Sequence, residues 1–181
     1  GAHGKANDLY SVLNTIKIIN SEKKLFNNDQ KLSFIFIGDG NEKKSLIKYA
    51  KNNKINNVFF EDPVPAYMVP SYLIHSDICL TNLKKIDSFK LVRPNKLFQY
   101  MALGKPIICG IWGEASSIIV NEAKSGIYVD FQNNICAAKE IIKLVQDDDK
   151  LKTYGINGIN YIKNKGDRKN ILEKYYINVK K

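Results

Sequence analysis

Hydrophobic residues are spaced in two ways along this chain. Between residues 8 and 19 they recur every three or four positions, which predicts an amphipathic helix. Leu32–Ile37 is a short, mostly apolar run that stops at Gly38-Asp39-Gly40, which predicts a buried strand. Four more short runs predict strands at residues 57–60, 78–80, 106–109 and 127–129.

Helical spacing returns between these strands. It predicts helices through residue 50, at 67–74, from Arg93-Pro94-Asn95 to Gly104, and at 115–123, 133–145, 150–162 and 167–179. Strands that alternate with helices imply an α/β fold, a Rossmann-like parallel sheet flanked by helices on both faces. Ligands bind such sheets at the carboxyl ends of the strands, so the segments of interest are residues 38–40, 62–66, 81–95 and 110–114.

A glycine-rich segment, Gly1-Ala2-His3-Gly4, stands directly before the first predicted helix. In an alternating sheet a strand precedes such a segment, and the sequence has none there. We therefore expect residues 1–181 to form a single domain that is a fragment of a longer protein, with a first strand absent. The C-terminal helices are expected at about 148–181.

The composition is that of a globular chain, since 44% of its 181 residues are hydrophobic and 25% are charged. A net charge of +10 suits anionic partners such as nucleic acid, nucleotide phosphates or an acidic membrane face. Only Arg93 and Arg168 are arginines, and lysine lacks the planar group that recognises phosphates and bases through two parallel bonds. A nucleic-acid partner is therefore disfavoured. An alternative origin of the positive charge is AT-rich coding DNA, which makes lysine codons abundant without a functional reason.

Residues for covalent or metal catalysis are scarce. His3 and His75 are the only histidines, and neither has a Cys–His or Ser–His–Asp pattern around it. Cys79, Cys109 and Cys136 lack metal-ligand spacing, so we expect three buried free thiols and no metal site. These patterns assign no catalytic residue.

Cations at the start of helices are more informative. The free amides and the dipole of a helix start favour a bound anion. Arg93, Asn95 and Lys96 stand at one predicted helix start, for which a solvated basic turn is the alternative. Lys5 stands at a second, in the segment before the first helix.

Several segments in a fixed order carry a family resemblance. The most specific is Pro94-Asn95-Lys96-Leu97-Phe98-Gln99-Tyr100-Met101-Ala102-Leu103-Gly104-Lys105-Pro106, and the others are residues 36–40, 57–60, 76–80, 113–115 and 123–127. In this order the chain resembles the C-terminal, donor-binding domain of glycosyltransferase family 4, in the branch that builds bacterial capsule, O-antigen or colanic-acid-type polysaccharides. The resemblance implies the C-terminal half of a GT-B fold, a nucleotide-sugar donor that is usually UDP-linked, and no cofactor or metal.

The resemblance also implies roles for single residues around the sugar and the ribose. Gln99 stands where the family has a glutamate that binds the ribose hydroxyls; an amide can donate and accept, but the charge-assisted bond is lost. Leu91 stands where a second family glutamate lies near the donor sugar, so the sugar contacts must come from elsewhere. Asp87, Ser88 and Glu114 are the candidates.

The donor diphosphate and the base are assigned in the same way. The family neutralises the departing diphosphate with cations, because negative charge develops there during transfer. Here the diphosphate candidates are Lys5, Arg93, Asn95 and Lys96. Contacts to the base and to the backbone around it are expected at Gly38, Pro63 and Val64.

These implications define the expected function. The domain would bind the donor of a glycosyltransferase of the hexosyl or N-acetylhexosaminyl type, whose acceptor is a lipid-linked molecule or a saccharide. The resemblance thus implies that residues 1–181 are a single nucleotide-sugar-binding domain without the N-terminal acceptor domain, which alone would bind the nucleotide sugar and transfer nothing. We expect a cytoplasmic location, peripheral contact with an anionic membrane and no nucleic acid. The alternatives are a sugar-nucleotide epimerase-like domain and a non-enzymatic basic module that binds nucleic acid or acidic lipid.

Overall fold

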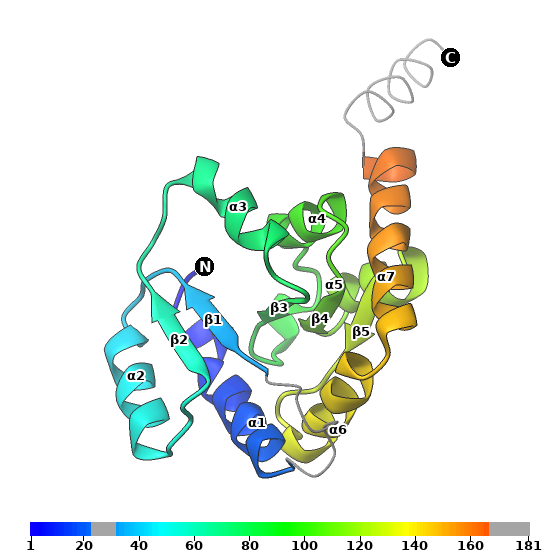
Figure 1. The fold of residues 1–181 in the computed structure, drawn as a ribbon. Helices are drawn as coiled ribbons and strands as arrows, with labels where there is room; N and C mark the ends of the chain where they lie inside the picture. The colour runs from blue at the N-terminus through cyan, green and yellow to red at the C-terminus, as the bar shows by residue number, and fades with distance from the viewer. Residues whose placement is uncertain (23–31, 167–181) are drawn as a thin grey trace.

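The structure, a computed structural model, describes residues 1–22 and 32–166 (Figure 1). All five of its strands pair in parallel. β1 (Phe34–Ile37) pairs with β2 (Val58–Glu61), and β4 (Ile107–Gly110) lies between β3 (Cys79–Asn82) and β5 (Gly126–Tyr128). The predicted α/β fold with parallel strands is confirmed. Within residues 1–22 and 32–166 the strands form two separate ladders and not one continuous sheet.

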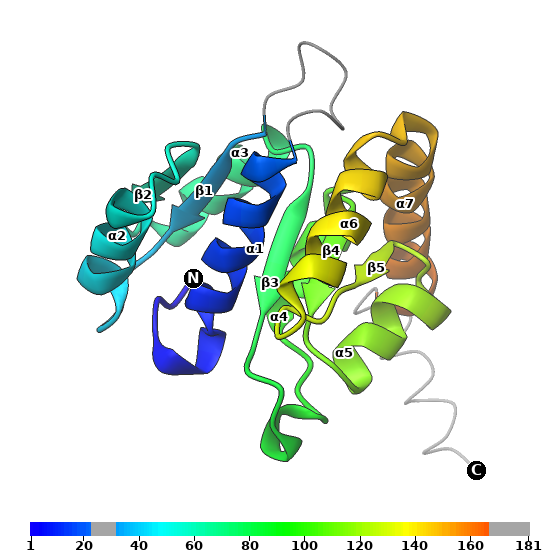
Figure 2. The same ribbon diagram turned by 90° about the horizontal axis from the view of Figure 1, so that it is seen from below.

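Helices lie on both sides of the strands (Figure 2). The longer ones are α1 (Leu9–Ser21), α2 (Lys43–Asn52), α3 (Val69–Ile74), α4 (Asn95–Ala102), α6 (Asn134–Val145) and α7 (Asp148–Tyr161). Shorter turns are η1 (Lys5–Asn7), η3 (Ala66–Met68), η4 (Asp87–Phe89), α5 (Glu114–Ser117), η5 (Ile118–Glu122) and η6 (Ile162–Gly166). No helix in the described ranges is long and apolar enough to span a bilayer.

Two hydrophobic cores lie on opposite faces of β4. Successive side chains of a strand point to opposite faces, and Ile108 therefore packs with α1, α2 and α6 in the first core. Ile107 and Cys109 pack with α4, α5 and η5 in the second core. The continuous apolar run that predicted this strand reflects coverage on both faces.

Four predictions about local structure need correction or fall outside the described residues. The segment of interest at residues 81–95, expected to follow a strand, begins inside β3, contains the turn η4 and ends at the first residue of α4. The predicted helix at 115–123 is a short α-helix, α5, followed by the π-helical turn η5. Cys79 and Cys109 are buried as predicted, but Cys136 is exposed because it lies on the outer side of α6. The predicted helix at 167–179 lies outside the described residues.

The glycine-rich first segment lies against the end of β1. Ala2 forms a parallel bridge with Asp39, and the His3 amide donates to the Asp39 carbonyl at 2.8 Å. A β-carbon on Gly38 would lie 1.8 Å from the Gly1 carbonyl oxygen, and one on Gly40 would lie 2.5 Å from the His3 backbone. Both glycines therefore allow the close approach of these two segments.

Candidate functional site

The candidate site lies at the carboxyl ends of the strands, where the Gly1–Asn7 segment meets the first turn of α4. A β-carbon placed on Gly1 would lie 3.7 Å from the Lys96 ammonium nitrogen. The sequence predicted anion binding at both segments separately, and the structure brings Gly1 and Lys96 together. In an open α/β sheet this edge is where ligands bind.

Lys96 gives the site its electrostatic character. The side chain is partly buried, and this burial lowers the pKa of its ammonium group. None of the ion pairs found in the described part of the chain includes Lys96. The pKa of the Gly1 amino group is lowered as well, first by burial and then by the charge of Lys96. Lys96, a cationic group without an acidic partner among residues 1–22 and 32–166, favours an anion beside it.

The remaining residues predicted to bind the diphosphate differ in their availability. Lys5 lies exposed in η1, and Asn95 is the exposed first residue of α4. Arg93 instead pairs with Glu114, with 2.8 Å from its Nε and 2.5 Å from its Nη2 to the carboxylate oxygen Oε2. Arg93, predicted for the diphosphate, and Glu114, predicted for the sugar, thus neutralise each other in this structure.

Gln99 lies in α4 three positions after Lys96. Side chains three residues apart on a helix project from the same side, and the Gln99 side chain is exposed. The structure therefore places the predicted ribose contact on the side of α4 that carries Lys96. The amide at this position can both donate and accept hydrogen bonds.

The segment after β2 follows an anchored turn. The Lys43 ammonium donates to the Glu61 carbonyl at 2.9 Å and pairs with the Asp62 carboxylate at 2.6 Å. Pro63, which is exposed, and Val64, which is partly buried, come directly after this turn. Gly38, the third residue predicted to lie near the base, is buried under the first segment of the chain.

Two loops that carry predicted sugar contacts lie against each other. Asp87 and Ser88 are exposed in η4. A few residues later the Lys90 carbonyl accepts a hydrogen bond of 2.8 Å from the Glu114 amide, and the Lys90 ammonium lies 5.3 Å from the centre of the Trp112 ring. The loop after β3 is therefore docked on the loop after β4.

His3 is the residue whose importance in the site is least evident from the sequence. Its side chain is 3% exposed and meets the stacked rings of Phe36 and Phe60 edge-on, with centroid distances of 6.4 and 6.0 Å. Burial, followed by the positive charges of the Gly1 amino group and Lys43, lowers its pKa. Its Nδ1 atom is among the buried polar atoms that lack a hydrogen-bond partner in the described structure. The only sequence signal was its place in the glycine-rich segment.

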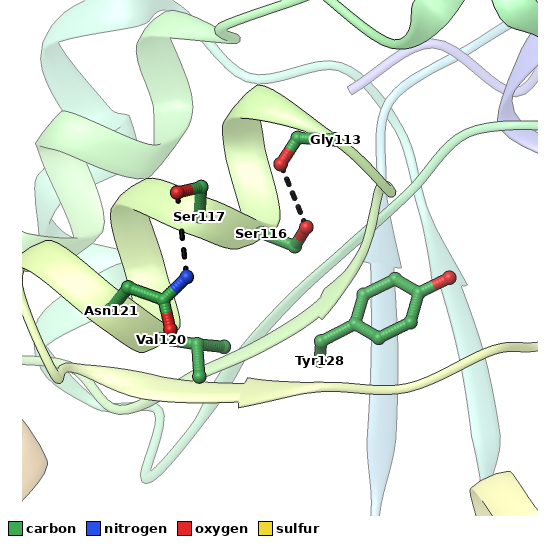
Figure 3. A pocket seen from close by; sticks show the side chains of 6 residues that line it. All are labelled: Gly113, Ser116, Ser117, Val120, Asn121 and Tyr128. Carbon is green, nitrogen blue, oxygen red and sulfur yellow. Dashed lines mark hydrogen bonds between the residues drawn. The ribbon is translucent and has the colours of Figure 1, made fainter.

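A shallow pocket lies beside the site, at α5 and η5 (Figure 3). Its lining consists of Gly113, Ser116, Ser117, Val120, Asn121 and Tyr128. Three of its polar side chains are already engaged, since Ser116 Oγ donates to the Gly113 carbonyl at 2.8 Å and Asn121 Nδ2 donates to Ser117 Oγ at 3.5 Å. None of the predicted donor-binding residues lines this pocket, although Glu114 follows Gly113 directly.

Comparison with known proteins identifies the chain's relatives. The family model described as glycosyl transferases group 1 matches residues 9–161. An uncharacterized glycosyltransferase from Methanocaldococcus jannaschii is 25% identical over 146 residues, which are 81% of this chain and 36% of that protein. The chain thus spans little more than a third of this curated relative.

Solved structures share the fold at low sequence identity. HepE from Anabaena in complex with UDP has a TM-score of 0.77 at 14% identity, over 99% of this chain and 47% of that one. The C-terminal domain of a glycosyl transferase group 1 protein from Francisella tularensis has a TM-score of 0.71 at 17% identity, over 93% of this chain and 84% of that one. These structural neighbours are GT-B glycosyltransferases, which agrees with the fold class predicted from the sequence.

Proposed function

Because this chain belongs to the glycosyl transferases group 1 family, we propose that it is a donor-binding domain that holds a nucleotide sugar, UDP-linked, by its diphosphate. A glycosyltransferase moves a sugar from such a donor to an acceptor and leaves the nucleotide diphosphate behind. The family membership supports the transferase reaction, and the complex of HepE with UDP supports the kind of donor.

The observation that carries this proposal is the charge of Lys96, which has no acidic partner in the part of the chain that the structure describes. An ammonium that is partly buried without an acidic partner costs free energy in the absence of an anion. A diphosphate at the start of α4 would supply the missing counter-charge and would meet the free amides of the helix. In the transfer reaction the same contacts would stabilise the charge that grows on the departing diphosphate.

Other residues take supporting roles in the proposal. Lys5 and Asn95 would contact the diphosphate, and Gln99 would hydrogen-bond the ribose. Pro63 and Val64, with Gly38 beneath, would lie against the base. Arg93 would reach the diphosphate only after it leaves Glu114, and that exchange would free the carboxylate for the sugar, to which Asp87 and Ser88 also contribute.

The proposal extends to the longer enzyme. Its acceptor would be a lipid-linked molecule or a saccharide in the synthesis of a cell-surface polysaccharide, at the cytoplasmic face of an anionic membrane. A second domain would bind the acceptor, so residues 1–181 would bind the donor and transfer nothing. The donor would be a hexosyl or N-acetylhexosaminyl nucleotide, and no metal would be required. The support for these points is the likeness of Pro94–Pro106 to the polysaccharide branch of the family.

Titration calorimetry with UDP tests the proposal. We expect Lys96→Met to weaken UDP binding by about tenfold or more, because a hydrogen bond to a charged group contributes about 1.5–3 kcal/mol. The matched control is Lys139→Met, which removes the same charge from the exposed side of α6 and should leave the affinity nearly unchanged. Absence of binding by the folded chain at millimolar UDP, or equal losses in both variants, would contradict the proposal.

A further inference from the structure

Lys43 is a buried lysine outside the set of residues proposed to bind the donor. It is the first residue of α2 and is 9% exposed. Lysine is rarely buried to this degree unless its ammonium group is paired. An apolar side chain of similar volume would fill the same place without the cost of removing a charge from water. The contacts of the ammonium group are therefore the feature that distinguishes lysine at this position.

These contacts lie at the carboxyl end of β2. The ammonium nitrogen is 2.9 Å from the Glu61 carbonyl oxygen and 2.6 Å from the Asp62 carboxylate. The hydrogen bond from Lys43 lowers the pKa of Asp62. The Glu61 carbonyl also accepts a hydrogen bond of 3.2 Å from the Gly38 amide. Lys43 thus ties the last residue of β2, and the residue after it, to the start of α2.

The same helix start also holds the glycine-rich first segment. The Lys43 amide donates to the Gly40 carbonyl at 3.1 Å, and the Glu42 amide donates to the His3 carbonyl at 3.0 Å. Burial lowers the pKa of His3 most, and the charges of the Gly1 amino group and of Lys43 lower it further. Residues 42 and 43 therefore hold the glycine-rich segment and the end of β2 in a fixed relation to each other.

The segment after Asp62 differs in charge from the part of the site around Lys96. Residues 63–74 include no charged residue, although the whole chain has a net charge of +10. The segment begins Pro63-Val64-Pro65, and because proline has no amide hydrogen, only the middle residue offers a backbone donor. No hydrogen bond between described residues uses that donor. An uncharged segment with an available amide suits a nucleotide base, which is flat and uncharged and has acceptors at its edge.

We propose that Lys43 is a positioning residue for recognition of the base. By holding Glu61 and Asp62, its ammonium group fixes the start of the segment 63–65, so that the base is bound at a set distance from the diphosphate beside Lys96. Lys43 itself does not contact the nucleotide in this arrangement. A segment that is ordered in advance loses little freedom on binding, and this raises the affinity. The inference rests on the proposed function, because it requires a nucleotide whose diphosphate lies beside Lys96.

Calorimetry with two ligands separates this role from a general effect of charge. UDP carries both the base and the diphosphate, whereas pyrophosphate carries the phosphates alone. We expect Lys43→Met to weaken UDP binding about fivefold or more and pyrophosphate binding less than about twofold, because only the base needs the ordered segment. Lys43→Arg keeps donors for the carbonyl and the carboxylate, so it should restore most of the UDP affinity. The control Lys48→Met, at an exposed position of α2, should change neither affinity.

Hydrogen exchange without any ligand tests the positioning step by itself. The Gly38 amide donates to the Glu61 carbonyl, and the Met68 amide donates to the Pro65 carbonyl at 2.9 Å. Both amides should exchange faster in Lys43→Met than in the unchanged chain, because the segment between them loses its anchor. If Lys43→Met does not fold, Asp62→Asn takes its place with the same readouts, because this exposed position tolerates the change while the ion pair is lost.

Three outcomes would overturn the inference. They are unchanged exchange at both amides in the folded variant, unchanged affinity for UDP, and equal losses of affinity for UDP and for pyrophosphate. Equal losses would mean that Lys43 acts through its charge and not through the base. Absence of UDP binding by the unchanged chain is a different result, since it would contradict the proposed function and the base recognition that rests on it. Exchange at the two amides would still show whether Lys43 orders the segment.

Discussion

The β1–β2 ladder and the β3–β4–β5 ladder share parallel pairing but differ in how their faces are covered. In β4, Ile107, Ile108 and Cys109 are all at most 3% exposed, because helices pack on both faces. In the β1–β2 ladder one face packs against α1 and α2, whereas Ile35 and Phe59 on the other face remain exposed. The comparison teaches that strands with the same parallel pairing can differ in how deeply their side chains are buried. That burial determines how much free energy of unfolding a substitution removes.

The largest expected effect compares two isoleucines in strands of the two ladders. Ile107→Ala should lower the free energy of unfolding by about 2–5 kcal/mol, because it leaves a cavity in a closed core. Ile35→Ala should lower it by less than about 1 kcal/mol, since its side chain is already largely in water. Urea denaturation of both variants measures the difference. Equal losses would show that the exposed face of β1 is covered in solution.

A second comparison concerns glycines that allow close backbone contacts. A β-carbon on Gly126 would lie 2.0 Å from the Ile107 carbonyl oxygen, inside the β4–β5 ladder. Gly126→Ala should therefore lower the free energy of unfolding by about 1–3 kcal/mol, because one strand must move. Gly38→Ala should instead displace the Gly1 segment and speed exchange of the His3 amide. The comparison fails if Gly38→Ala leaves that amide as protected as before.

The smallest expected effect is a pH dependence that originates beside β1. The unfolded chain protonates His3 near its ordinary pKa of about 6.5, whereas burial holds the pKa in the folded chain below that value. Below about pH 6.5 the unfolded state binds more protons, so the free energy of unfolding should fall as the pH drops. The slope from this residue is at most about 1.4 kcal/mol per pH unit.

Urea unfolding between pH 7.5 and 5 measures this slope. His3→Phe should flatten it, because phenylalanine keeps an aromatic ring against Phe36 and Phe60 without a titrating group. The control His75→Asn removes an exposed histidine and should keep the slope of the unchanged chain. If both variants behaved alike, the dependence would not come from His3.

Much of the fold could be predicted because it depends on neighbours in the sequence. The apolar runs and the glycines after Ile37 predicted the five strands and their positions along the chain. Helical spacing predicted α1, α4, α6 and α7. Errors arose where a local pattern has two solutions. The apolar spacing at 115–123 is the same for an α-helix and for a helix that widens into a π-turn, and the neighbours of Cys136 do not show which side of α6 faces the core.

The sequence named candidate residues for the site, but it did not predict which of them pair with each other. The sequence identified Lys96 and Arg93 as equivalent cations at one helix start. In the structure Arg93 pairs with Glu114, 21 positions away, while Lys96 lies beside Gly1 without an acidic partner among the described residues. His3 was noticed for its position, but its burial against two aromatic rings depends on β1 and β2.

By itself the sequence determined the alternation of strands and helices, the glycine positions that permit close contacts and the family resemblance, because these are carried by local spacing. Only the tertiary structure decided which cation is neutralised, which strand face is exposed and how the described strands divide into two ladders. Charge pairing, burial and edge pairing depend on groups that are far apart along the chain, and folding alone brings them to within a few ångströms of one another.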